Sequence, residues 1–78
     1  MTKEKKSDRD VLLKAVGARI RDLRLEKGLS QEELALAAGL DRSYIGGVER
    51  GERNIAVMNL KKIANALGVS LSELARHL

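Results

Sequence analysis

Two short helical patterns joined at one glycine, within residues 31–50, constrain this chain more than any other feature. A residue that readily takes a positive φ is needed where two helices turn sharply, and Gly39 stands there. A small residue is needed where the helices approach closely, and Ala35 meets that need. The β-branched Ile45 then holds the second helix against the first. This spacing predicts a helix-turn-helix, the unit whose second helix enters the DNA major groove.

The composition predicts one small helical domain. The chain has 78 residues, no cysteine, no proline and a single aromatic residue, while Leu, Ala and charged residues dominate. Its first ten residues are mostly charged, and no apolar segment is long enough to span a membrane, so we expect a soluble cytoplasmic protein. The formal net charge of +4 favours a polyanionic partner, although many small domains are mildly basic.

Capping residues and glycines divide the chain into five expected helices, which makes the predicted fold class all-α, a compact five-helix bundle. Ser30 with Glu33 matches a capping box, as does Ser70 with Glu73, and Asp41 is expected to cap the third helix. The helices are expected at residues 8–27, 31–38, 42–50, 57–67 and 71–77, after a flexible tail at residues 1–7. The residues expected to face the core from the first and fourth helices are Leu12, Val16, Ile20 and Leu23, and Val57, Leu60, Ile63, Ala64 and Leu67.

Three glycines fall inside the expected helices, and each weakens its helix by about 1 kcal/mol relative to alanine. Gly17 makes the first half of the first helix the less secure half. Gly46 and Gly47 lie side by side in the third helix. They suggest a close approach to a neighbouring helix or to a ligand surface, or they are simply weak helix formers.

Polar residues in and around the third helix form the predicted DNA-contacting surface. Arg42, unless it is merely solvated, can bind guanine O6 and N7 with two hydrogen bonds. Ser43 can contact a base or a phosphate, and Tyr44 offers a hydroxyl for phosphate or a ring for a thymine methyl group. Gln31, with the free N–H groups at the start of its helix, can bind a phosphate. The complete predicted set is Gln31, Arg42, Ser43, Tyr44, Gly47, Arg50, Arg53 and Asn54.

Other roles remain open for several of these residues. Arg50 and Arg53 follow the third helix and either grip the DNA backbone or pair with Glu49 or Glu52 on a solvated surface. Tyr44 is either a DNA contact or a partly buried packing residue.

Glu49 is an acidic residue on a helix that is expected to face phosphates. We therefore expect its side chain to turn inward or sideways and to pair with Arg19 or Arg24 of the first helix. A buried pair of this kind would fix the geometry of the helices more than it would add stability.

The segments LEKGLSQEELA, AGLDRSYIGGVERGERN and NLKKIANALGV resemble the Cro/repressor type of helix-turn-helix domain, the xenobiotic-response-element class with the lambda-repressor-like fold. Within that class, LDRSYIGGVERGERNI is similar to the controller proteins of restriction–modification systems. The resemblance implies a homodimeric regulator that binds palindromic operators and both activates and represses transcription. It also implies that Arg42, Ser43 and Tyr44 contact bases and backbone, with Gln31, Arg53 and Asn54 near phosphates.

Dimerisation is expected on physical grounds as well, because one recognition helix reads too few base pairs to find a site in a genome. A twofold dimer doubles the contacts and sets the half-sites about one DNA turn apart. The resemblance places the interface in the last two helices, residues 57–78. The expected interface residues are Met58, Leu71, Leu74, Ala75 and Leu78. The alternative is that Leu71 and Leu74 pack within the monomer.

Ala56 departs from the family pattern, in which Ser or Thr precedes the fourth helix. The helix then lacks a good N-cap, at a cost of about 1 kcal/mol, unless Asn54 substitutes.

Other functions fit the sequence less well. An enzyme is not expected, because the only histidine is His77 near the end of the chain and no serine has a base partner. We expect no cofactor, metal or small-molecule ligand. A generic phage or chromosomal repressor, or an antitoxin, is the nearest alternative. A helical protein-interaction module without DNA binding is another, supported by the acidic Glu32 and Glu33 beside the expected DNA-contacting surface. Glu33 is explained by the capping box, however, and Glu32 could instead contact RNA polymerase.

Overall fold

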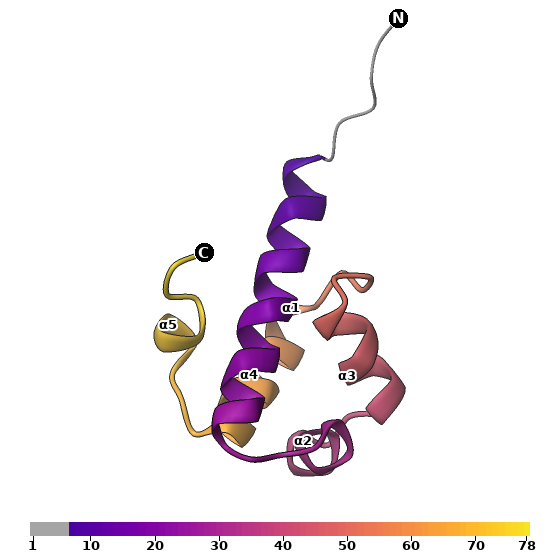
Figure 1. Ribbon diagram of the computed structural model, residues 1–78, viewed down its shortest axis with the longest axis vertical. Coiled ribbons are helices and arrows are strands. Elements are labelled where there is room, and N and C mark those ends of the chain that lie inside the picture. Colours follow the sequence, from indigo (N-terminus) through magenta and orange to yellow (C-terminus); the bar gives the residue numbers. More distant parts are fainter. Residues whose placement is uncertain (1–6) are drawn as a thin grey trace, which may run out of the picture.

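Five α-helices and their connecting turns make up the described part of the chain, residues 7–78, in the computed structural model (Figure 1). No strand occurs among these residues, so the predicted all-α fold class is confirmed. Most of the predicted tail, residues 1–6, lies outside the described residues. The helices are α1 (Asp8–Glu26), α2 (Gln31–Ala38), α3 (Arg42–Glu49), α4 (Val57–Leu67) and α5 (Leu71–Leu74).

Serine caps begin three of the helices. The Ser30 hydroxyl accepts a hydrogen bond from the Glu33 backbone N–H at 2.9 Å, and the Glu33 carboxylate accepts one from the Ser30 N–H at 2.8 Å. The predicted capping box of α2 is therefore confirmed. Ser7 caps α1 in the same way through its hydroxyl. At α5 the Ser70 hydroxyl accepts a hydrogen bond from the Glu73 N–H. The reciprocal bond of a capping box, from the Ser70 N–H to the Glu73 carboxylate, does not form in the described structure.

Two other helices begin without a side-chain cap. Asp41 occupies the N-cap position of α3, as predicted, but its carboxylate makes no capping hydrogen bond. Ala56 is the N-cap residue of α4, which also starts without a side-chain bond. The alternative in which Asn54 supplies the missing cap is therefore not realised in the described structure.

Helix α5 is shorter than predicted, since it ends at Leu74 and not at His77. The Arg76 and Leu78 N–H groups each bond to the carbonyl three residues earlier, which is the pattern of a tightened turn. His77 then takes a positive φ of 70°, which an α-helix does not allow.

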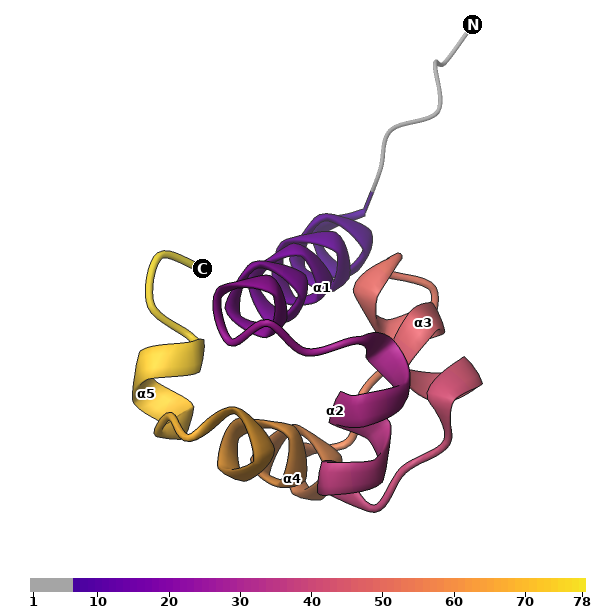
Figure 2. The ribbon, with the colours of Figure 1, turned by 60° about the horizontal axis from the view of Figure 1, so that its bottom comes forward.

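The core lies between α1, α2 and α4, with α3 at one side of the bundle and α5 at the opposite side (Figures 1 and 2). Two residues predicted to face it do not. Leu12 is 52% exposed because the first turns of α1 project beyond the other helices, and Val57 is 71% exposed on the first turn of α4 (Figure 1). The buried apolar residues are Val16, Ile20, Leu23, Leu34, Ala35, Ala38, Ile45, Val48, Ile63, Ala64, Leu67 and Leu74.

Gly17 marks a close approach between α1 and the end of α3. A Cβ atom built at this position would lie 2.3 Å from the Val48 carbonyl oxygen and 2.6 Å from the Glu49 carbonyl oxygen. Both contacts are to backbone, so no side chain could rotate away to relieve them. The glycine that weakened α1 on propensity grounds is thus the residue that lets α3 pack against it.

Candidate nucleic-acid interface

Helices α2 and α3 form the predicted helix-turn-helix. Gly39 ends α2 in the left-handed conformation, with φ 71° and ψ 33°, as the turn requires. The Leu40 N–H closes this turn on the Ala35 carbonyl at 2.9 Å. From α3, Ile45 is fully buried and Val48 is 2% exposed, so the helix packs by the predicted face.

The opposite face of α3 points to solvent from its first turn. Arg42 and Ser43 are exposed there, while Tyr44 is half-buried. A recognition helix contacts base edges chiefly through its first residues, and the two exposed side chains stand in that position. Figure 2 shows α3 along the outer edge of the bundle.

Tyr44 is held by residues from two other segments. The Asn59 side-chain amide of α4 donates a hydrogen bond to the Tyr44 hydroxyl at 3.1 Å. The Arg53 guanidinium lies 5.7 Å from the centre of the Tyr44 ring, within the range of a cation–π contact. Sequence reasoning missed Asn59, because nothing in the pattern of α4 indicated that Asn59 meets α3.

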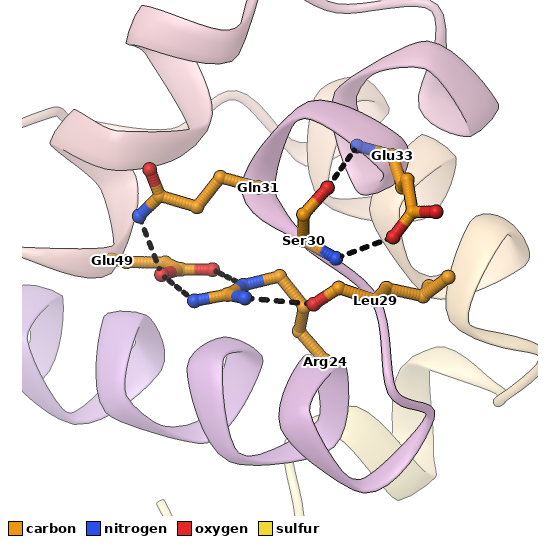
Figure 3. A network of polar contacts seen from close by, with 6 residues as sticks. All are labelled: Arg24, Leu29, Ser30, Gln31, Glu33 and Glu49. Carbon is orange, nitrogen blue, oxygen red and sulfur yellow. Dashed lines mark hydrogen bonds and ion pairs between the residues drawn. The ribbon is translucent and has the colours of Figure 1, made fainter.

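Glu49 is buried and pairs with Arg24 (Figure 3). The Arg24 Nε and Nη2 groups donate to the two carboxylate oxygens at 2.6 and 3.0 Å, and Nη1 donates to the Leu29 carbonyl at 2.8 Å. Of the two predicted partners, Arg24 is therefore the one that pairs. Arg19 instead donates to two backbone carbonyls of α5.

This bidentate geometry changes the acidity of the guanidinium. The hydrogen bonds to Glu49 raise the pKa of Arg24 above its ordinary value, burial opposes them, and Coulomb attraction to the carboxylate adds to the increase. Because the pKa is raised on folding, the stabilising charge is fully present at and below the ordinary arginine pKa and is lost only as the pH rises through the still higher folded-state pKa. The pair therefore gives no pH switch near neutrality through its arginine.

Gln31 belongs to the same network. Its Nε2 group donates to a Glu49 carboxylate oxygen at 3.0 Å (Figure 3). One of the two amide hydrogens is used in this way, and the other is left for an external acceptor such as a phosphate oxygen. The buried Glu49 thus fixes the orientation of a side chain predicted to contact DNA.

Arg50 and Arg53 lie against the two glycines of α3. A Cβ at Gly46 would lie 3.1 Å from an Arg50 guanidinium nitrogen, and one at Gly47 would lie 2.8 Å from the Arg53 Cγ. The close approach expected at these glycines is therefore made by side chains of the chain itself. Arg50 also pairs with Glu52 at 3.0 Å, as the alternative interpretation anticipated, and both side chains are 61% exposed. Such an exposed ion pair contributes little to stability and restrains the Arg50 side chain only weakly.

The residues predicted for the dimer interface divide into two groups. Met58 is 68% exposed and Leu78 is 46% exposed, and Ala75 also faces solvent. Leu71 is half-buried, whereas Leu74 is fully buried in the core of the monomer. Leu74 is therefore removed from the predicted contact residues, in line with the alternative that it packs within one chain.

No helix among residues 7–78 has the length and apolar character needed to cross a membrane. Within the same range, no cluster of three or more His, Asp or Glu side chains is arranged to hold a metal ion.

Comparison with known proteins identifies the family. Residues 20–74 match the family described as Helix-turn-helix. A hypothetical transcription factor from Neisseria meningitidis serogroup B is 53% identical over 55 residues, which make up 70% of this chain and 52% of that protein. This chain thus spans about half the length of that relative.

Two solved structures are similar over most of their length. The restriction–modification controller protein C.AhdI from Aeromonas hydrophila matches with a TM-score of 0.81 and 55% identity, covering 82% of this chain and 97% of that one. The controller protein C.Esp1396I, as a tetramer with its natural 35-base-pair operator, matches with a TM-score of 0.78 and 42% identity, covering 88% of this chain and 87% of that one. The chain belongs to the helix-turn-helix family, and within it resembles the controller proteins of restriction–modification systems.

Proposed function

We propose that the protein is a cytoplasmic, homodimeric regulator of transcription that binds a palindromic operator and controls a restriction–modification system. The observation that carries the proposal is the orientation of α3. Ile45 and Val48 are buried against the rest of the bundle, so Arg42 and Ser43 are directed outward on the first turn. A similar controller protein was crystallised on its operator, which supports the same use of this surface.

The arrangement of charge supports DNA as the partner. The only buried acid on α3, Glu49, is neutralised by Arg24, so it adds little negative potential to the outer face. Arg42, Arg50 and Arg53 remain exposed around the helix. This pattern suits a phosphate backbone, which accounts for a large share of protein–DNA affinity.

A titration followed by NMR tests the binding surface, and it does not require the operator sequence. Isotope-labelled protein is titrated with a random-sequence duplex at low salt, where non-specific binding is measurable. We expect the largest amide shifts at the start of α2, along α3 and at residues 53–54. Shifts confined to α5, or none at all, would show that the helix-turn-helix serves protein contact and not DNA binding.

Activation of transcription would require a contact to RNA polymerase, and Glu32 on the exposed side of α2 is the residue we assign to it. We expect Glu32→Ala to reduce activation from a reporter promoter while operator affinity stays the same. Glu33→Ala is not a suitable control, because Glu33 closes the capping box. Unchanged activation by the Glu32 variant would remove this residue from the mechanism.

A further inference from the structure

Two uncharged residues hold a tyrosine and an arginine together beside the recognition helix. Resting on the proposed function, we infer that Gly47 and Asn59 are positioning residues that preform Tyr44 and Arg53 as one DNA-contacting unit. Tyr44 comes from α3, Arg53 from the following loop and Asn59 from α4. The unit therefore joins three segments before DNA arrives.

Gly47 provides the surface on which Arg53 lies. A Cβ at this position would be 2.8 Å from the Arg53 Cγ, 3.3 Å from Nε and 3.6 Å from Cδ. Gly47 is buried although it belongs to the outer half of the helix, because the aliphatic part of Arg53 covers it. Any side chain here would lift Arg53 from the helix and away from the Tyr44 ring, which its guanidinium now faces at 5.7 Å.

Asn59 fixes the direction of the Tyr44 hydroxyl. The Asn59 amide donates to the hydroxyl oxygen, so the hydroxyl hydrogen is free to be donated elsewhere. The Arg53 guanidinium has donors only. The unit therefore presents donors to solvent, which matches phosphate oxygens and the acceptor edge of guanine.

Preforming the unit lowers the conformational entropy lost on binding. A free arginine side chain must be immobilised when it contacts DNA, whereas Arg53 is already held by Gly47 and Tyr44. We therefore expect Gly47→Ala to weaken operator binding by about threefold to tenfold, although alanine favours the helix. The obstructing atoms belong to a flexible side chain and not to backbone, so the fold should tolerate the added methyl group.

A double-mutant cycle tests the role of Gly47. Wild-type protein, Gly47→Ala, Arg53→Ala and the double variant are titrated with an operator recovered by selection from a random-sequence pool. Urea unfolding of each is measured in parallel. We expect Gly47→Ala to unfold at the same or a higher urea concentration than wild type, and to have little further effect on affinity once Arg53 is absent.

A second cycle tests Asn59. We expect Asn59→Ala to weaken binding in the wild-type background and to have little effect in the Tyr44→Phe background, where no hydroxyl remains to be oriented. Equal effects in both backgrounds would overturn the assignment of Asn59.

The outcomes separate this inference from the proposed function. If wild-type protein recovers no operator, the proposed function fails, and the inference fails with it. If wild-type protein binds its operator and Gly47→Ala binds equally well, or weakens binding by the same factor with and without Arg53, the inference alone is wrong.

Discussion

Two glutamates near the end of α3 each pair with an arginine, but one pair is buried and the other is exposed, so their loss should affect stability very differently. Glu49 is buried with Arg24, whereas Glu52 and Arg50 are both 61% exposed. We expect Glu49→Ala to lower the free energy of unfolding by about 3–5 kcal/mol, because it leaves Arg24 buried and unpaired. Glu52→Ala is the matched control and should cost less than about 1 kcal/mol. Urea unfolding measures both, and similar losses would contradict the distinction.

The exposed arginines should separate into one that reads sequence and one that holds the backbone. We expect Arg42→Ala to cost about 1–3 kcal/mol of discrimination at one base pair of the operator. Arg50→Ala should instead weaken binding to all sequences alike and reduce the salt slope by about 1. Titrations of operator and mutated duplexes at several salt concentrations measure both quantities. Equal losses on every duplex for Arg42→Ala would remove its reading role.

At this scale, sequence reasoning reached the type of interaction but not always the partner. A lone acid on a DNA-facing helix called for a basic partner, and Arg19 and Arg24 of the first helix were the two candidates. The structure resolves it because Arg24 faces α3, while Arg19 faces α5. The bond between Asn59 and Tyr44 was not predictable, since it depends on the angle at which α4 meets α3.

At the scale of secondary-structure elements, the packing of α1 on α3 depends on the absence of a side chain at Gly17. We expect Gly17→Ala to destabilise the protein by about 1–3 kcal/mol, because its Cβ would press on rigid backbone carbonyls. Ala18→Gly, at the exposed neighbouring position, reports helix propensity alone and should cost about 1 kcal/mol. If Gly17→Ala raised the urea midpoint, propensity and not close packing would determine this position.

Helix boundaries followed the local signals that the sequence contains. The capping box at Ser30 and the left-handed Gly39 involve only neighbouring residues, so the start and the end of α2 were predictable. The early end of α5 has no such signal. Arg19 of α1 donates to the Glu73 and Leu74 carbonyls, and this long-range contact satisfies groups that would otherwise favour a longer helix.

At the scale of the whole molecule, exposed apolar residues on α4 and at the end of the chain favour self-association. Met58 is 68% exposed, next to Val57 at 71%, and Leu78 is 46% exposed. We expect the wild-type protein to sediment as a dimer at tens of micromolar, and Met58→Glu to sediment as a folded monomer. Leu36→Glu is the control, because Leu36 is 84% exposed on α2, outside the proposed interface. A wild-type monomer, or a dimer that survives Met58→Glu, would contradict this interface.

The fold of residues 7–78 was predictable because capping, glycine placement and apolar spacing agree along most of this range. The mode of assembly and the details of DNA recognition were less predictable from the sequence. A single chain does not reveal which exposed apolar residues a second copy covers, and Leu74 was predicted for the interface although the monomer core contains it.

Selection from a random-sequence duplex pool, repeated at two salt concentrations, tests the proposed function most directly. A dimer that reads DNA through two copies of α3 should recover a palindromic site with half-sites about one helical turn apart. Its affinity should fall steeply as salt is raised, because several arginines contact phosphates. If no sequence is enriched and binding stays weak at low salt, the protein does not act as an operator-binding regulator.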